Sequence, residues 1–261
     1  MAIADTPAIE ITYVGGPTAL IEIAGVTFIT DPTFDAAGKD YRSGTVTLRK
    51  LAGPAIGVDQ LGHIDVALVS HEQHPDNLDE LGRVLASKVP LTLTTRAGAA
   101  KVGPDAVGLS PWERREIPAP SGVTLTVTAT PARHGPAGIE RIAGEVVGFV
   151  IGVADTREDL VYVTGDTVWY AGTAEVARRY APRVVLMFAG AARTRGPFHL
   201  TMDTNDAVEV ASAFQHATLV PVHHEGWAHF TQSQDDIAAT FATLGIEDRL
   251  RRVTPGDSVR F

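Results

Sequence analysis

The sequence predicts an α/β protein with a four-layer αββα sandwich, in which two mixed β-sheets pack together and helices cover their outer faces. Each half of the chain opens with closely spaced β-rich segments and continues as an alternation of strands and helices. No linker or low-complexity stretch divides the 261 residues. We therefore expect residues 1–261 to form a single domain, since α/β domains of this size often fold as one unit.

The first half begins with three short β-rich runs, ITYV (11–14), TALIEI (18–23) and VTFITD (26–31). Only Ala24 and Gly25 separate the second run from the third, which is the length of a tight hairpin turn. Residues 36–62 are rich in Gly and Pro without a clean period and predict a long loop. The alternating part that follows comprises strands within 63–70 and 91–95 and helices within 78–88, with apolar residues at 78, 81, 84 and 85 on one face, and 97–103.

The second half repeats this order. Residues 112–130 predict one or two strands, and residues 145–153 and 159–166 predict a hairpin around a charged turn. The remaining predicted elements are helices within 173–181, 202–215 and 234–245, strands within 184–191 and 218–224, and a closing strand or hairpin at 251–261.

Composition narrows the class of protein. Cysteine is absent, which excludes disulfides and thiolate metal sites and fits a cytoplasmic location. The first residues show no basic start and no apolar core, so we expect no secretion signal, and no window of roughly 18 apolar residues predicts a membrane span. The net charge of −9 argues against nucleic acid as a partner. We expect a small-molecule substrate, and homo-oligomer formation stays open.

Several predicted strands lead directly into imidazole or carboxylate side chains. Sites form at strand ends and in the loops after them in α/β proteins. His and Asp without Cys are the ligand set of hydrolytic divalent metals. The residues in question are His71, His74 and Asp76 after the first such strand, and His134, Asp166, His199 and His223 after four later ones.

Each of these residues also has an ordinary structural interpretation. A lone histidine after a strand is more often a hydrogen-bonded loop residue, and Asp166 could cap a turn. Asn77-Leu-Asp-Glu80 has the form of a capping box, with Asn77 as the N-cap of the following helix. The repetition of the pattern over separate strands favours a metal site.

The ordered motifs resemble the metallo-β-lactamase fold superfamily, in particular its UlaG-like and N-acyl-phosphatidylethanolamine phospholipase D-like branch. The resemblance covers nearly the whole chain and implies a metallo-hydrolase with one or two divalent ions. Zinc is the expected metal of this binuclear centre, with manganese or iron as alternatives. The motifs are GGPTALIEIAGVTFITDP (15–32), SHEQHPDNLD (70–79), TPARHG (130–135), GDT (165–167), HLTMDTNDAVE (199–209) and PVHHEGW (221–227).

Carried over by position, the resemblance assigns roles to individual residues. It implies His71, His74 and His134 as ligands of a first ion and Asp166 as a bridging carboxylate. It assigns Asp76 and His199 to a second ion, and it places His223 near the site as a contact of a ligand or of the substrate. Asp76 and Asp166 are the expected catalytic residues, because they would orient the metal-bound hydroxide.

The chain departs from the family pattern at three positions. The histidines of the metal loop are spaced i, i+3, so the loop has one extra residue and must bulge. Asn77 stands where the family has His, and its amide is either a weaker ligand or a neighbour of the ligands. Gly16 also replaces a family histidine.

The implied reaction is hydrolysis of an ester, lactone or phosphodiester-type small substrate. Arg193 and Arg195 just before His199 predict an anionic substrate, and Trp169 and Trp227 are candidates for a pocket wall. Solvated charges and core aromatics are the alternative interpretations of these four residues. A non-catalytic binding protein with a degenerate metal site is the alternative function, and iron-dependent redox chemistry is a second one.

Overall fold

The computed structural model describes residues 6–43, 45–156 and 158–261. The first of its two large sheets has seven strands. Its order is β15-β1-β2-β3-β6-β7-β8, antiparallel from β15 to β3 and parallel from β3 to β8. The strands are β1 (Ile9–Gly15), β2 (Thr18–Ile23), β3 (Val26–Thr30), β6 (Val66–Leu68), β7 (Leu91–Thr95), β8 (Ala106–Leu109) and β15 (Ser258–Arg260).

The second sheet has six strands in the order β14-β13-β12-β11-β10-β9. It is antiparallel from β9 to β12 and parallel from β12 to β14. The strands are β9 (Arg114–Pro118), β10 (Thr124–Pro131), β11 (Val147–Val153), β12 (Asp159–Val163), β13 (Val184–Phe188) and β14 (Thr218–Val222). Both sheets are therefore mixed, as predicted.

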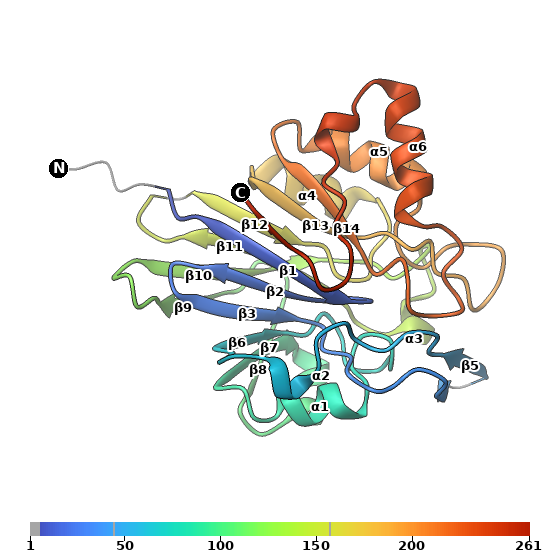
Figure 1. The fold of residues 1–261 in the computed structure, drawn as a ribbon, viewed down its shortest axis with the longest axis horizontal. Helices are drawn as coiled ribbons and strands as arrows, with labels where there is room; N and C mark the ends of the chain where they lie inside the picture. Colours follow the sequence, from blue (N-terminus) through green and yellow to red (C-terminus); the bar gives the residue numbers. More distant parts are fainter. Residues whose placement is uncertain (1–5, 44, 157) are drawn as a thin grey trace.

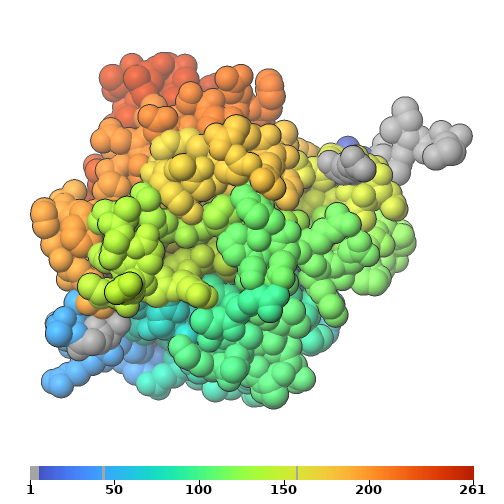
Figure 2. All heavy atoms as spheres, turned by 180° about the vertical axis from the view of Figure 1, so that it is seen from behind, coloured from blue at the N-terminus to red at the C-terminus, as the bar shows by residue number. Residues whose placement is uncertain are grey.

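Helices cover the two outer faces (Figure 1). The helices α1 (Glu80–Ala86) and α2 (Arg96–Val102) lie on the first sheet, whereas α4 (Ala171–Arg179), α5 (Thr204–Ala213) and α6 (Gln234–Leu244) lie on the second. The largest apolar cluster lies between the sheets, where alternate residues of β1, such as Ile9, Ile11 and Tyr13, are fully buried. The predicted four-layer αββα sandwich is confirmed. Seen from behind, segments between about residues 95 and 150 cover the middle of the molecule (Figure 2).

Local sequence explains most of these elements. Ala24 (φ +55°) and Gly25 (φ +85°) form the tight turn between β2 and β3, which pair through Ile23 and Val26. The hairpin of β11 and β12 is also confirmed. The α1 helix forms as predicted, but Leu81 and Val84 are each 49% exposed, so its apolar face is narrower than the periodicity predicts.

The prediction of an irregular loop over residues 36–62 was wrong. This segment contains a two-stranded hairpin of β4 (Asp40–Ser43) and β5 (Val46–Arg49), and a 3-10 turn at Val58–Gln60. A bridge between Lys50 and Trp227 ties the hairpin to the loop after β14. Short strands with one buried residue, such as Leu48, carry little periodic signal. The strand β8 and the short helix α3 (Glu140–Ala143) were also not predicted.

No helix in the described part of the chain combines the length and the apolar character that crossing a bilayer requires.

Candidate metal centre

Four strand ends converge at one place between the sheets. His71 follows β6, His134 follows β10, Asp166 follows β12 and His223 follows β14. The structure groups these residues with two others into two sets, and the donor atoms of each set lie within 4.8 Å of one another. The first set is His71, His74 and His134, and the second set is Asp76, Asp166 and His223.

The first set consists of three buried imidazoles. His71 Nε2 and His74 Nδ1 lie 2.9 Å apart, and the His134 ring centroid is 5.3 Å and 5.0 Å from those of His71 and His74. His134 Nδ1 is 2.9 Å from the Leu200 carbonyl, which leaves Nε2 facing the set. Donors around a tetrahedral zinc ion are roughly 3.3 Å apart, so this arrangement fits one ion.

The extra residue of the metal loop is accommodated by a bulge with two anchors. The Glu72 carboxylate accepts from Lys101 Nζ at 2.7 Å, and Arg83 donates to the Glu72 carbonyl at 2.8 Å. Gln73 points the other way and donates to the carbonyls of Ala143 (3.0 Å) and Glu145 (3.1 Å). The bulge therefore lets His71 and His74 converge despite their spacing.

Asp166 lies between the two sets. Its Oδ2 is 3.6 Å from His134 Nε2 in the first set, and its Oδ1 is 3.3 Å from His223 Nε2 in the second. Asp76 completes the second set, with Oδ2 3.7 Å from His223 Nε2. One carboxylate facing both sets is the arrangement that a bridging ligand requires.

The second set contains buried polar atoms that find no hydrogen-bond partner among the described residues. Buried polar groups are rarely left unpaired in native proteins, so several together indicate a missing partner. Divalent ions fit, because the atoms are carboxylate oxygens and imidazole nitrogens. The unpartnered atoms are Asp76 Oδ1, Asp166 Oδ2, His223 Nδ1 and His223 Nε2, with Asn77 Oδ1 and His229 Nδ1 beside them.

The electrostatics favour the metal-binding protonation state at His71, His74, Asp76 and Asp166, whereas the nearby carboxylate of Asp166 raises the pKa of His223 against the effect of burial. Burial lowers the pKa of His71, and burial together with the neighbouring His134 lowers the pKa of His74 to about 4, so both imidazoles are neutral. Burial acts to raise the pKa of Asp76 and Asp166, but nearby imidazoles outweigh it and hold both pKa values below their usual range.

Asp31, in the Thr30-Asp31-Pro32 (TDP) end of the first motif, is linked by hydrogen bonds through Ser70 to His71 and through Asn77 to Asp166. Its carboxylate accepts from the Ser70 amide (2.5 Å) and the Ser70 hydroxyl (2.6 Å), and that hydroxyl is 2.9 Å from His71 Nδ1. Asn77 Nδ2 donates to Asp31 and to Asp166, each at 3.1 Å. Burial raises the pKa of Asp31 to about 7. Contacts of this kind orient metal ligands.

Asn77 is not the N-cap of α1, so the predicted capping box was wrong. The N-cap is Asp79, which accepts from the Gly82 amide. Asp79 also accepts from Phe34, Asp35 and Lys50, so a carboxylate two residues later serves the helix and leaves Asn77 inside the metal centre.

At Gly16 the backbone takes part in the site. Its carbonyl accepts from the His223 amide at 2.7 Å. His223 adopts φ +55°, a left-handed conformation that is costly for a residue with a Cβ atom, and this contact helps to hold it. Trp227 Nε1 lies 3.6 Å from where a Cβ of residue 16 would be.

The structure does not bring His199 to either set. Its imidazole lies 3.1 Å from Asp206 and 3.5 Å from Asp203, in the first turn of α5. Only the backbone of its neighbour Leu200 reaches the centre, through His134. His199, Asp203 and Asp206 form a separate group whose donor atoms lie within 4.8 Å of one another, and the second set contains His223 beside Asp76 and Asp166.

A small cavity of about 20 Å³ opens on the sets and has room for about one water molecule. Arg195 lines it, whereas Arg193 is exposed, donating its amide to the His229 carbonyl. Trp169 packs against the outer core of the second sheet, so it forms no wall of this cavity. The cavity is lined by Val46, Leu48, His74, Asp76, His134, Ala143, Ala192, Thr194, Arg195, Leu200 and His229.

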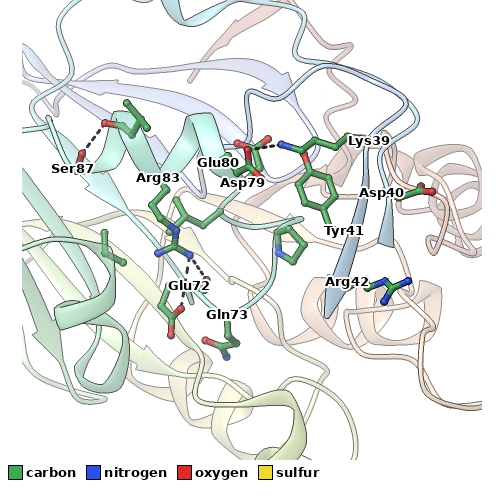
Figure 3. A pocket seen from close by; sticks show the side chains of 14 residues that line it. Lys39, Asp40, Tyr41, Arg42, Glu72, Gln73, Asp79, Glu80, Arg83 and Ser87 are labelled. Atoms are coloured by element: carbon green, nitrogen blue, oxygen red, sulfur yellow. Dashed lines mark hydrogen bonds and ion pairs between the residues drawn. The ribbon is translucent and has the colours of Figure 1, made fainter. Parts of the chain in front are cut away.

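A cavity of about 610 Å³ lies on the other side of the metal loop (Figure 3). It is bordered by β4, by α1 and by Glu72 and Gln73, and no residue of the two sets lines it. Arg83 points to Glu72 there, and Lys39 points to the acidic start of α1. Despite its size, we place no chemistry in this cavity, because the convergent imidazoles and carboxylates face the smaller one.

His229 was not singled out from the sequence. Its Nε2 lies 2.9 Å from Asp76 Oδ2, and it lines the small cavity. It comes six residues after His223, inside a loop. The sequence pattern points only to polar residues at or just after the end of a predicted strand. A local signal was available only in the clustering of His223, His224 and His229 within one short segment.

A family model described as the beta-lactamase superfamily domain matches residues 27–224, which include both sets. The chain belongs to the beta-lactamase superfamily. Its relatives include proteins named metal-dependent hydrolases, and the family places this chain among them.

Curated relatives match this beta-lactamase superfamily member over nearly all or about half of its length. It is 25% identical to the UPF0173 protein YddR of Bacillus subtilis, over 97% of this chain and 100% of the relative. Over 135 residues it is also 30% identical to N-acyl-phosphatidylethanolamine-hydrolyzing phospholipase D 1 of Caenorhabditis elegans. This match covers 47% of this chain and 37% of that relative.

Solved structures share the fold. The isothiocyanate hydrolase from Delia radicum gut bacteria superposes with a TM-score of 0.82 at 23% identity, covering 97% of this chain and 99% of that one. The metallo hydrolase Igni18 from Ignicoccus hospitalis superposes with a TM-score of 0.73 at 19% identity, covering 97% and 98%.

Proposed function

We propose that the protein hydrolyses a small anionic substrate of the ester, lactone or phosphodiester type with the help of two divalent ions. The observation that carries this proposal is the pair of adjoining ligand sets with Asp166 between them. His71, His74 and His134 would hold one ion, and Asp76, Asp166 and His223 the other. Such ions lower the pKa of a water toward about 7 and stabilise negative charge on the substrate.

Zinc suits the first set, because three neutral imidazoles are its common ligands. The second set is richer in carboxylate and also suits manganese or iron. The buried ligand atoms without a hydrogen-bond partner support a centre that holds ions. They therefore favour a metal-dependent hydrolase over a binding protein with a degenerate metal site.

The protein's own groups would position the water and the substrate. Asp76 lines the cavity, and its unpartnered Oδ1 can accept a hydrogen bond from a water there and orient it. Val46 and Leu48 of the β4–β5 hairpin cover the cavity and exclude other water.

Arg195 would bind the negative charge of the substrate. It borders the cavity beside His74, and it forms no ion pair with any described residue. A guanidinium free of protein partners can bind a carboxylate or phosphate in fork geometry. Arg193 is exposed on the same loop, so the two arginines form a natural comparison.

The test is a comparison of Asp166→Ala with wild type after loading with Zn²⁺ or Mn²⁺. Metal content is measured by elemental analysis, and turnover is measured on a panel of phosphodiesters, lactones and esters. An isothiocyanate joins the panel, because a protein of the same fold carries that name. We expect Asp166→Ala to lose metal and to lose more than about 100-fold in kcat/KM, since even residues that only orient ligands cost 10–100-fold.

His199→Gln is the matched control, because this imidazole lies outside both sets. It should keep the metal content and the rate of wild type. Full metal and full rate in Asp166→Ala would contradict the proposal, as would a metal-loaded wild type that turns over no member of the panel.

A further inference from the structure

The second set offers two carboxylates and one imidazole, and position 77 does not supply another imidazole. The Asn77 amide nitrogen faces Asp31 and Asp166, each at 3.1 Å. Asp166 requires this orientation, because its pKa is lowered and an ionised carboxylate can only accept hydrogen bonds. The Asn77 side chain therefore donates an N–H to Asp166, a member of the second set.

His229 approaches the second set from the loop after β14. Its Nε2 lies 2.9 Å from Asp76 Oδ2, and its side chain is only 8% exposed. Its ring packs against Phe230, with centroids 4.6 Å apart, and against Trp227 at 6.1 Å. Phe230 also contacts the His223 ring at 4.7 Å, so one aromatic side chain supports both imidazoles.

His229 borders the second set beside Asp76, outside the group of Asp76, Asp166 and His223 whose donor atoms all lie within 4.8 Å of one another. It lines the same small cavity as His74, Asp76 and His134. Its Nδ1 is buried and has no hydrogen-bond partner among the described residues. The 2.9 Å separation from Asp76 Oδ2 is close to the roughly 3 Å between two donors that share one ion.

We propose that His229 supplies the imidazole that position 77 lacks and is a ligand of the second divalent ion, with Asp76, Asp166 and His223. This inference rests on the proposed metal-dependent function. It assigns to a loop residue after β14 the role that the family pattern gives to the residue after Asp76.

The test compares the metal content of His229→Gln with that of wild type. Each protein is stripped of metal, titrated with Zn²⁺ by calorimetry, and analysed for bound zinc. Glutamine keeps an N–H that can donate to Asp76, but its amide is a poor zinc ligand, so the variant separates ligation from mere orientation of Asp76. We expect wild type to bind two ions, and His229→Gln to keep the first and lose the second, with affinity lowered more than about 100-fold.

His199→Gln is the control and should bind two ions as wild type does. A second variant adds Asn77→His to His229→Gln, and we expect it to regain the second ion. X-ray absorption of the fully loaded proteins gives a readout independent of affinity, because His229→Gln should show fewer imidazole ligands per zinc than wild type.

Two ions of unchanged affinity in His229→Gln would overturn the inference and leave the hydrolase proposal intact. A wild type that holds a single ion, with the same affinity in His229→Gln, would do the same. Loss of the second ion in His199→Gln but not in His229→Gln would assign the role to His199 instead. A wild type that binds no ion would contradict the proposed function itself.

Discussion

The charge of the buried Asp166 carboxylate is maintained by the side chains around it. This carboxylate is 1% exposed, and isolated charges are costly to bury. Here His134 and His223 lie on either side, and Asn77 donates to it, so the charge is kept. The two carboxylate oxygens therefore face different sets, one toward His134 and the other toward His223.

Arg195→Ala is expected to raise KM for anionic substrates about tenfold or more and to leave neutral ones unchanged, because hydrogen bonds to charged groups contribute about 1.5–3 kcal/mol. The measurement is steady-state kinetics on a matched pair of charged and neutral substrates. Arg193→Ala should change neither, since this side chain is exposed. Equal effects of the two substitutions would argue against a specific anion contact.

Lys50→Met is expected to lower the free energy of unfolding by about 3 kcal/mol, because it leaves the carboxylate of Asp79 buried without its cation. Lys50 Nζ lies 2.8 Å from Asp79 Oδ2, and the two side chains are 3% and 0% exposed. Urea denaturation of the metal-loaded proteins measures this. Lys88→Met, at an exposed lysine, should change stability by less than about 0.5 kcal/mol. A Lys50→Met protein as stable as wild type would show that the pair is dispensable.

Among the elements, α1 links the metal loop to the first sheet. Asp79 caps its first turn, and Gly82 packs on the backbone of the TDP motif. A Cβ atom at Gly82 would lie 1.7 Å from the Pro32 carbonyl oxygen. The helix therefore sits as close to the strand end as a glycine permits, and it holds the loop from His71 to Asp76 in place.

Gly82→Ala is expected to lower the free energy of unfolding by about 1–3 kcal/mol, as overpacking against rigid backbone does. Helix propensity alone predicts the opposite sign, because Ala is favoured over Gly by about 1 kcal/mol in a helix. Thermal or urea denaturation decides between the two. Gly62→Ala is the control, since nothing lies within 4 Å of its added Cβ. A stabilised Gly82→Ala protein would rule out the close packing described for α1.

At the scale of the whole molecule, the centre joins the two halves of the chain. The residues of the two sets follow strands of both sheets, and the core between the sheets is the largest apolar cluster. Ions bound there would stabilise the folded state over the unfolded one, because the unfolded chain has no assembled site.

Removal of metal with a chelator is expected to lower the melting temperature by roughly 5–10 °C, from about 2.7 kcal/mol of linkage at a 100-fold excess of ion over Kd and 2–4 °C per kcal/mol for a domain of this size. Differential scanning calorimetry measures it, and added Zn²⁺ should restore the original value. An unchanged melting temperature after verified removal of metal would show that the ions add nothing to folding.

The sequence determined most of the elements and the residue types of the centre, because hydrophobic period, turn residues and motifs are local properties, but it missed the β4–β5 hairpin, β8 and α3. The strands leading to His71, His134, Asp166 and His223 could be predicted from runs of a few residues. Which loop histidine comes near the second set was decided by the tertiary structure alone. His199 and His229 both lie in loops after strands, and only the packing shows that His199 pairs with the acidic turn of α5, whereas His229 packs on Phe230 and lies 2.9 Å from Asp76. That choice depends on contacts between residues up to 153 positions apart, which no local pattern encodes.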